Sequence, residues 1–134
     1  MRKIKILIVD DDTELAQMLA KTLALDGYEV CIANSAGEFR LQVFTMKPGL
    51  IILDIYLGNE DGPEVYKQLL NAGLDRNTPV IFLSALIPEN PMPRSIPVTP
   101  GRKYAMHGKP FRYPNLVEDI RLLTGSHQGF DLTA

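Results

Sequence analysis

Short apolar runs that end abruptly at a polar residue are the clearest pattern along this chain. Three runs end in this way: Ile4–Val9 before Asp10, Leu50–Leu53 before Asp54, and Val80–Leu83 before Ser84. Apolar runs of this length predict strands that are buried on both faces, which is typical of parallel sheets. In an open α/β sheet, ligands bind outside the carboxyl ends of the strands. The pattern therefore predicts a sheet and a polar site at one of its edges.

Segments with helical spacing of apolar residues separate these runs, and each carries terminal signals. The signals are Asp12 and Gly27 for the first helix, the capping box Ser35–Glu38 for the second, Pro63 and Gly73 for the third, and Pro114 and Gly125 for the last. Tyr28–Ala33 and Tyr104–His107 complete the predicted strands. Strands that alternate with helices predict a doubly wound α/β fold with a five-stranded parallel sheet.

The alternation fails between residues 88 and 100, where the chain carries a cluster of prolines. These are Pro88, Pro91, Pro93, Pro97 and Pro100. Proline removes a helical hydrogen bond and clashes with the preceding turn. We therefore expect an irregular or polyproline-like segment in place of most of the fourth helix, with at most a turn or two of helix.

Size and composition favour a single globular domain over residues 1–125, with residues 126–134 as a tail or linker stub. The formal net charge of −2, without a basic stripe, argues against direct nucleic-acid binding. No apolar run approaches the roughly 20 residues of a membrane span. The single cysteine, Cys31, lies in the apolar run Tyr28–Ala33 and is expected to be a small buried hydrophobe. We expect a cytoplasmic protein.

The predicted sheet edge gathers carboxylates. Asp10, Asp11 and Asp54 follow strands, so they should converge, repel one another and raise each other's pKa values. A bound divalent cation relieves that repulsion, and all-oxygen ligands suit Mg²⁺. Lys109, just after the last predicted strand, could reach this acidic edge as a point charge.

Taken together, these segments resemble the receiver domain of two-component response regulators, the family that includes the chemotaxis regulator. The matching segments are Ile6–Asp12, Leu50–Asp54, Glu60–Gly62, Val80–Ala85 and Lys109–Phe111. The resemblance extends from residue 3 to about residue 124. It implies a flavodoxin-like fold with strand order 2-1-3-4-5.

The resemblance also implies site roles. Asp54 would accept a phosphoryl group from the phosphohistidine of a sensor histidine kinase or a histidine phosphotransfer protein. Mg²⁺ would be bound by Asp10, Asp11, Asp54 and the backbone carbonyl of Tyr56. Ser84 and Lys109 would contact the phosphoryl oxygens, and the Lys109–Pro110 bond would be cis. Such a domain catalyses only its own phosphorylation and dephosphorylation, so it is not a turnover enzyme.

The chain departs from the family pattern at three places. Gly58 stands where receivers usually carry proline, and Met106 stands where they carry Tyr or Phe. Tyr104 lies on the same face of its strand as Met106 and is expected to be a core residue. The proline-rich segment replaces a helix that normally helps to form the output face, so we expect signalling through that face to differ.

Three alternatives remain. A pseudo-receiver, which docks partners without phosphorylation, would tolerate Met106 and the odd segment. A phosphatase of the haloacid dehalogenase type needs a second acid two residues after the nucleophile, and Tyr56 occupies that place. A flavodoxin-like flavin binder is disfavoured, since the aspartates after the first strand would repel the flavin phosphate. The sequence leaves open the downstream partner and whether the chain is free-standing, a phosphorelay intermediate or part of a larger regulator.

Overall fold

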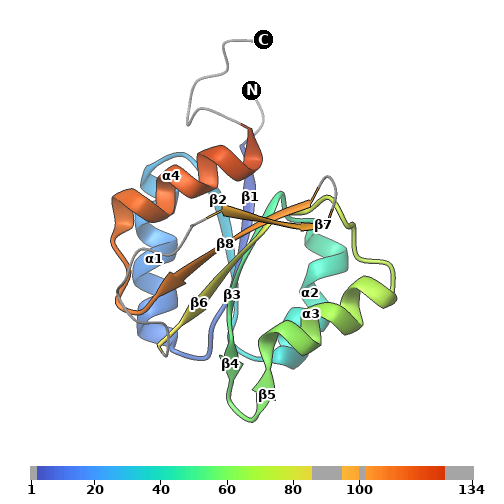
Figure 1. Cartoon of the computed structure of the whole chain (residues 1–134). Helices are drawn as coiled ribbons and strands as arrows, with labels where there is room; N and C mark the ends of the chain where they lie inside the picture. The colour runs from blue at the N-terminus through green and yellow to red at the C-terminus, as the bar shows by residue number, and fades with distance from the viewer. Residues whose placement is uncertain (1–2, 86–94, 100–101, 126–134) are drawn as a thin grey trace.

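A computed structural model describes residues 3–85, 95–99 and 102–125. They form a mixed sheet between two layers of helices (Figure 1). The strands of the main sheet are β1 (Lys5–Val9), β2 (Glu29–Ala33), β3 (Leu50–Asp54), β6 (Val80–Ser84), β7 (Ser95–Thr99) and β8 (Arg102–Gly108). The helices are α1 (Thr13–Leu25), α2 (Ala36–Met46), α3 (Gly62–Asn71) and α4 (Tyr113–Thr124).

The predicted five parallel strands and their order are confirmed. The main sheet runs β2-β1-β3-β6-β8-β7, and every neighbouring pair from β2 to β8 is parallel. This register brings the carboxyl ends of β1, β3 and β6 to one edge, since Val9 pairs with Leu53 and Leu53 pairs with Phe82. Two further strands, β4 (Tyr56–Leu57) and β5 (Glu60–Asp61), form a small antiparallel hairpin between β3 and α3.

The expectation that the proline-rich segment is irregular throughout is wrong for residues 95–99. These residues form β7, which pairs antiparallel with β8 at the edge of the sheet. Pro97 lies in β7, and the register shifts between Pro97 and Thr99. A proline cannot donate to a strand ladder, but an edge strand has one side without a partner and tolerates it. Residues 86–94 lie outside the described residues, so the expectation for them stays a prediction.

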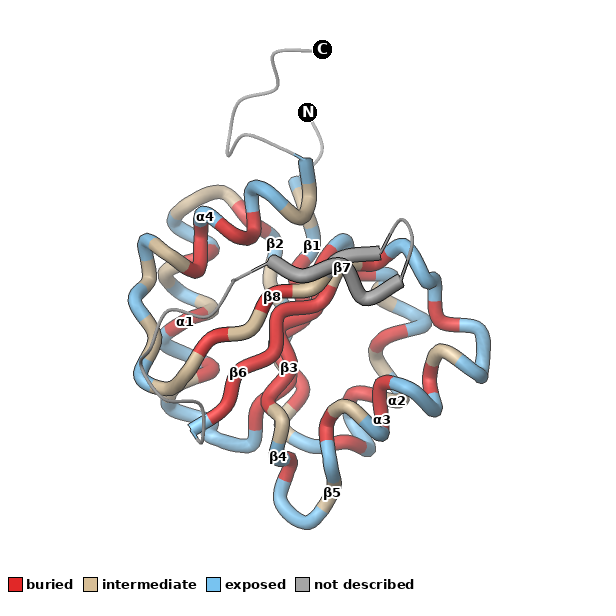
Figure 2. The backbone as a smooth tube through the Cα atoms, viewed as in Figure 1, coloured by how far each residue is buried: buried red, intermediate tan, exposed pale blue. Residues whose placement is uncertain are grey.

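Two apolar clusters pack on opposite faces of the sheet. One unites β-strand residues with α2 and α3, including Phe39, Val43 and Leu69, and the other packs α1 and α4 on the opposite face through Leu19 and Ile120. Figure 2 shows that burial is concentrated along the central strands. As predicted, Tyr104 is a core residue: it is partly buried and its ring contacts Phe82 edge to face.

The helix signals are confirmed. The Asp12 and Ser35 side chains accept hydrogen bonds from the first turns of α1 and α2, Pro63 lies in the first turn of α3, and Gly125 ends α4 with a positive φ of 67°. Cys31, by contrast, was predicted to be buried and is exposed. It lies on β2, an edge strand that pairs on one side only among the described residues. Among the described residues, no helix has the length and hydropathy needed to cross a membrane.

Candidate functional site

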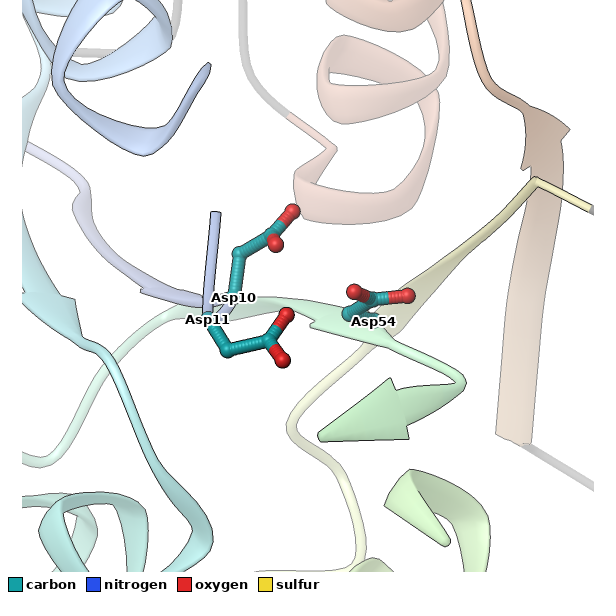
Figure 3. A group of neighbouring side chains, drawn as sticks. All are labelled: Asp10, Asp11 and Asp54. Carbon is teal, nitrogen blue, oxygen red and sulfur yellow. The ribbon is translucent and has the colours of Figure 1, made fainter. Parts of the chain in front are cut away.

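The three acids singled out from the sequence lie together where β1 and β3 end, and they form the acidic cluster: Asp10, Asp11 and Asp54. One carboxylate oxygen from each lies within 4.8 Å of the others. Figure 3 shows the three side chains gathered at these strand ends. Asp10 is 1% exposed and Asp54 is 6% exposed, whereas Asp11 is exposed to solvent. The cluster therefore pairs two buried carboxylates with one that solvent can reach.

Lys109 brings the positive charge to this cluster. It is the first residue after β8, and its backbone N–H donates to the carbonyl of Ser84 at 2.9 Å, which extends the pairing of β6 with β8. Its Nζ lies 2.9 Å from Asp10 Oδ2 and 3.1 Å from Asp54 Oδ2. The Lys109–Pro110 bond is cis, as expected.

Burial and charge shift the pKa values of two of these groups. Burial raises the pKa of Asp54 above its usual range, the negative charge of Asp10 raises it further, and the hydrogen bond from Lys109 offsets part of the change. Burial works to lower the pKa of Lys109, but its contacts with Asp10 and Asp54 outweigh burial and raise that pKa. Lys109 is therefore a firmly charged ammonium, and ionised Asp54 lies in a setting that penalises its charge.

Backbone N–H groups hold each carboxylate of the cluster in place. Asp12 N–H donates to Asp10 Oδ1 at 2.9 Å, Gly58 N–H donates to Asp11 Oδ2 at 3.0 Å, and Tyr56 N–H donates to Asp54 Oδ1 at 3.3 Å. Gly58 and Tyr56 both belong to the turn of chain that includes β4 and β5. This hairpin therefore holds two carboxylates that come from different strands.

Gly62 allows that hairpin to close tightly against β3. Its N–H donates to the carbonyl of Ile55 at 2.7 Å, and a Cβ at this position would lie only 2.1 Å from the backbone oxygen of Asp54. Real Cβ atoms do not approach a backbone atom this closely, so any larger residue would displace Asp54 or the hairpin.

The residues of the cluster fit a hard divalent cation. Three carboxylates and one ammonium leave a formal excess of two negative charges. Asp10 Oδ2 is buried, and within the described residues it receives no hydrogen bond of good geometry, although Lys109 Nζ is its ion-pair partner. Carboxylate oxygens are the preferred ligands of such cations, of which Mg²⁺ takes one or two carboxylates together with water.

Three other residues singled out from the sequence lie on strands β6, β8 and β4: Ser84, Met106 and Tyr56. Ser84 ends β6 and is 2% exposed, and Met106 is partly buried on β8, where it packs against the apolar cluster that includes α2 and α3. Tyr56 follows Asp54 by two residues, and its side chain is 51% exposed. The sequence thus correctly marks the edge of the sheet, and the structure shows how far each side chain is buried there.

One neighbour of the cluster was missed. Asn34 follows β2, and its side-chain amide donates to the backbone carbonyl of Asp10 at 3.1 Å. The signal was available, because Asn34 is also a polar residue that directly follows an apolar run, as Asp10 and Asp54 do.

A buried pair of side chains outside the cluster was also missed. His107 on β8 and Asp119 on α4 form the His–Asp pair, with 2.7 Å between Nε2 and Oδ2 and exposures of 8% and 2%. No spacing rule joins a strand residue to a helix residue twelve positions later, so this pair could not be predicted from the sequence.

Comparison with known proteins gives a consistent result. A family model of the response regulator receiver domain matches residues 6–121. Similar curated proteins include the uncharacterized transcriptional regulatory protein YvcP and the alkaline phosphatase synthesis transcriptional regulatory protein PhoP, both of Bacillus subtilis (strain 168). Each is 40% identical over 81 residues, which is 60% of this chain and 33% of the relative. The match thus spans about a third of the length of these relatives.

Solved structures resemble the whole fold. The receiver domain of the Francisella response regulator 1452 is 25% identical, with a TM-score of 0.73 over 92% of this chain and 98% of that one. A putative response regulator from Chloroflexus aurantiacus is 26% identical, with a TM-score of 0.75 over 93% of this chain and all of the other.

Proposed function

This chain belongs to the response regulator receiver domain family of two-component systems, and on that premise we propose that it is a phosphorylation-dependent switch. Asp54 accepts the phosphoryl group from a phosphohistidine. The donor is a sensor histidine kinase or a histidine phosphotransfer protein. The reaction regulates the chain itself, so the protein is a phosphoacceptor and not a turnover enzyme.

One observation carries this proposal: Lys109 contacts both Asp10 and Asp54 within a cluster that still keeps an excess of negative charge. A purely structural salt bridge would balance its charges. Phosphoryl transfer, in contrast, needs a nucleophile, a fixed positive charge for the transferring oxygens and a place for a divalent cation. Asp54, Lys109 and the acidic cluster supply these three parts.

The residues divide the work as follows. An oxygen of the Asp54 carboxylate attacks phosphorus, the P–N bond to the donor imidazole breaks, and the imidazole nitrogen keeps the electron pair. The product is an acyl phosphate on Asp54. Lys109 pairs with one phosphoryl oxygen, and the hydroxyl of Ser84 donates to another. The hairpin around Tyr56 and Gly58 keeps the carboxylates from turning away during the transfer.

Asp10, Asp11, Asp54 and the backbone carbonyl of Tyr56 would hold Mg²⁺, which when bound offsets the negative charge that gathers on the phosphoryl oxygens. The chain's own contribution is to keep these oxygens close together before any cation arrives. The Asp12 and Gly58 N–H groups do so for Asp10 and Asp11.

Incubation with acetyl phosphate or phosphoramidate and Mg²⁺, followed by intact mass spectrometry, tests the proposal. The natural chain should gain the mass of one phosphoryl group, and Asp54→Asn should gain none. Asp12→Asn is the matched control, since it also removes one negative charge beside the cluster while asparagine remains an effective N-cap for α1. This control should gain the phosphoryl group as the natural chain does.

A pseudo-receiver is the second candidate, and Met106 on β8 favours it. Receivers usually carry Tyr or Phe at this position, and a flexible thioether cannot replace a rigid aromatic ring that responds to phosphorylation. The same experiment separates the two functions. A natural chain that gains no mass with acetyl phosphate or phosphoramidate and Mg²⁺ would contradict the proposed switch and support the docking module.

The downstream partner is a separate proposal, because the matching relatives are about three times as long as the matched segment. Their names mark them as transcriptional regulators. We propose that output from this chain does not depend on a regular helix before β8, because β7 already occupies the edge of that strand. Replacing residues 88–94 with a helix-forming sequence, which leaves β7 in place, should leave partner binding intact. Loss of binding with folding and phosphorylation retained would contradict this.

A further inference from the structure

Asn34 connects the end of β2 to the backbone of the acidic cluster. Asp10 N–H donates to the carbonyl of Ala33 at 3.0 Å, which extends the ladder between β1 and β2 by one step. In a parallel ladder, the carbonyl of Asp10 would next accept from the backbone of the residue two positions past Ala33. That residue, Ser35, instead begins α2 as its N-cap. The side-chain amide of Asn34 donates to Asp10 O at 3.1 Å in its place.

The bond has a direct geometric consequence for two carboxylates. The carbonyl of Asp10 belongs to the planar peptide that joins Asp10 to Asp11, so fixing this oxygen fixes the plane between the two residues. Rotation of that plane would swing the Asp11 side chain away from Asp54. Gly58 holds the Asp11 carboxylate at its far end, and Asn34 holds the peptide at its near end.

Asn34 is itself held in place by α2. Its backbone N–H donates to Glu38 Oε1 at 3.0 Å, while the Glu38 backbone N–H donates to Ser35 Oγ at 3.1 Å. The Glu38 carboxylate thus reaches past the N-cap to Asn34. The first turn of α2 therefore holds Asn34, and Asn34 in turn holds the peptide between Asp10 and Asp11.

We propose that Asn34 is a positioning residue for the divalent cation: its amide orients the peptide between Asp10 and Asp11 and thereby sets the affinity of the acidic cluster. This rests on the proposed function, in which that cluster binds Mg²⁺. Asn34 touches neither the cation nor the phosphoryl group. Removing a group that orients metal ligands typically weakens metal binding by about tenfold or more.

A titration with Mg²⁺ alone tests the proposal without any phosphoryl chemistry. The backbone amide of Gly58, which donates to Asp11, is a suitable reporter in a two-dimensional NMR spectrum. Asn34→Ala should raise the dissociation constant for Mg²⁺ about tenfold. Asn34→Leu, which keeps the approximate size of the side chain but has no donor, should raise it by a similar factor.

Gln42→Ala is the matched control. The Gln42 side-chain amide also donates to a backbone carbonyl of β2, that of Ile32, at 3.2 Å, but it lies away from the cluster. Both alanine variants lose one amide–carbonyl bond, so their melting temperatures without Mg²⁺ should fall by similar amounts. Only the Asn34 variants should lose affinity, and their phosphorylation rate should recover at high Mg²⁺ concentration.

Three results would overturn the proposal, and two of them concern the variants: both Asn34 variants binding Mg²⁺ within about twofold of the natural chain, or Gln42→Ala losing as much affinity as they do. A natural chain that shows no saturable Mg²⁺ binding would also overturn it. A natural chain that binds Mg²⁺ but gains no phosphoryl group refutes the proposed switch alone, because the measured affinities still decide the role of Asn34.

Discussion

Within the described residues, acidic side chains are buried against basic ones at two places, and the two places differ in the number of acids that share each base. In the acidic cluster, three carboxylates share one ammonium, and Asp10 Oδ2 receives no well-aligned hydrogen bond within the described residues. In the His–Asp pair, one imidazole faces one carboxylate at 2.7 Å, and both are almost fully buried between β8 and α4. The acidic cluster keeps an excess of negative charge, whereas in the His–Asp pair each group has one partner.

Under the proposed function, this difference separates a site that would bind a cation from a contact that only stabilises the fold. The two groups of the His–Asp pair already bind each other, so neither is available to a ligand. Removing one partner is unfavourable because the other would be left in an apolar setting. A cluster with excess acid is costly for the fold on its own, but the cost is relieved when a cation arrives. Mutation of the two sites should therefore change the free energy of unfolding in opposite directions.

The largest expected effect on the free energy of unfolding comes from the His–Asp pair. Asp119→Ala leaves His107 buried without its partner and should lower the free energy of unfolding by about 3 kcal/mol. Alanine is a good helix former, so the loss will not come from α4 itself. Urea denaturation measures the change, and Leu122→Ala at an exposed position of the same helix is the control. A loss below about 1 kcal/mol would mean that the pair contributes no more than an ordinary hydrogen bond.

An intermediate effect is expected from Lys109, which competes with any cation for Asp10 and Asp54. Lys109→Met keeps the apolar stem and removes the charge, so Mg²⁺ should bind about tenfold more tightly. Phosphoryl transfer should nevertheless slow, since the transferring oxygens lose their ammonium partner. Calorimetric titration measures the affinity, with Lys67→Met on exposed α3 as the control. Weaker Mg²⁺ binding by Lys109→Met would show that the lysine orders the carboxylates more than it repels the cation.

The smallest effect concerns Asp54 and pH in the absence of divalent cations. The pKa of Asp54 is raised in the fold, so its contribution to stability is fully present below the ordinary carboxyl pKa and is lost as the pH rises through the raised value. Asp54→Asn has no ionisable group at this position, so it does not lose stability in this way as the pH rises. Near neutral pH with chelator it should melt above the natural chain, and the difference should shrink as the pH falls into the ordinary carboxyl range.

Added Mg²⁺ provides the control for this prediction. It should stabilise the natural chain more than Asp54→Asn, because the variant lacks one carboxylate ligand. Thermal melts across pH, with and without Mg²⁺, measure both effects. If Asp54→Asn melts below the natural chain at neutral pH in chelator, the hydrogen bond from Lys109 outweighs burial and the charge of Asp10.

Much of the fold could be predicted because its signals are local. The runs that end at Asp10, Asp54 and Ser84, and the capping residues Asp12 and Ser35, each depend on neighbours in sequence. The convergence of Asp10, Asp11 and Asp54 followed from one topological rule, since parallel strands end at a common edge.

The failures all concern edges and partners. Cys31 was expected to be buried because its run is apolar, but β2 is an edge strand and leaves it exposed. Pro97 argued against regular structure, yet β8 offers a free edge to which a proline-containing strand can pair. Neither strand can be recognised as an edge strand from its own residues, because its position at the edge depends on how the other strands are arranged.

By itself, the sequence determined the alternation of strands and helices, the edge at which the acids gather and the family to which the chain belongs. Only the tertiary structure decided that Asn34 holds the Asp10 peptide and that His107 meets Asp119. The physical reason is that periodicity and capping act over a few residues, whereas a hydrogen bond between distant segments exists only after packing has brought them together.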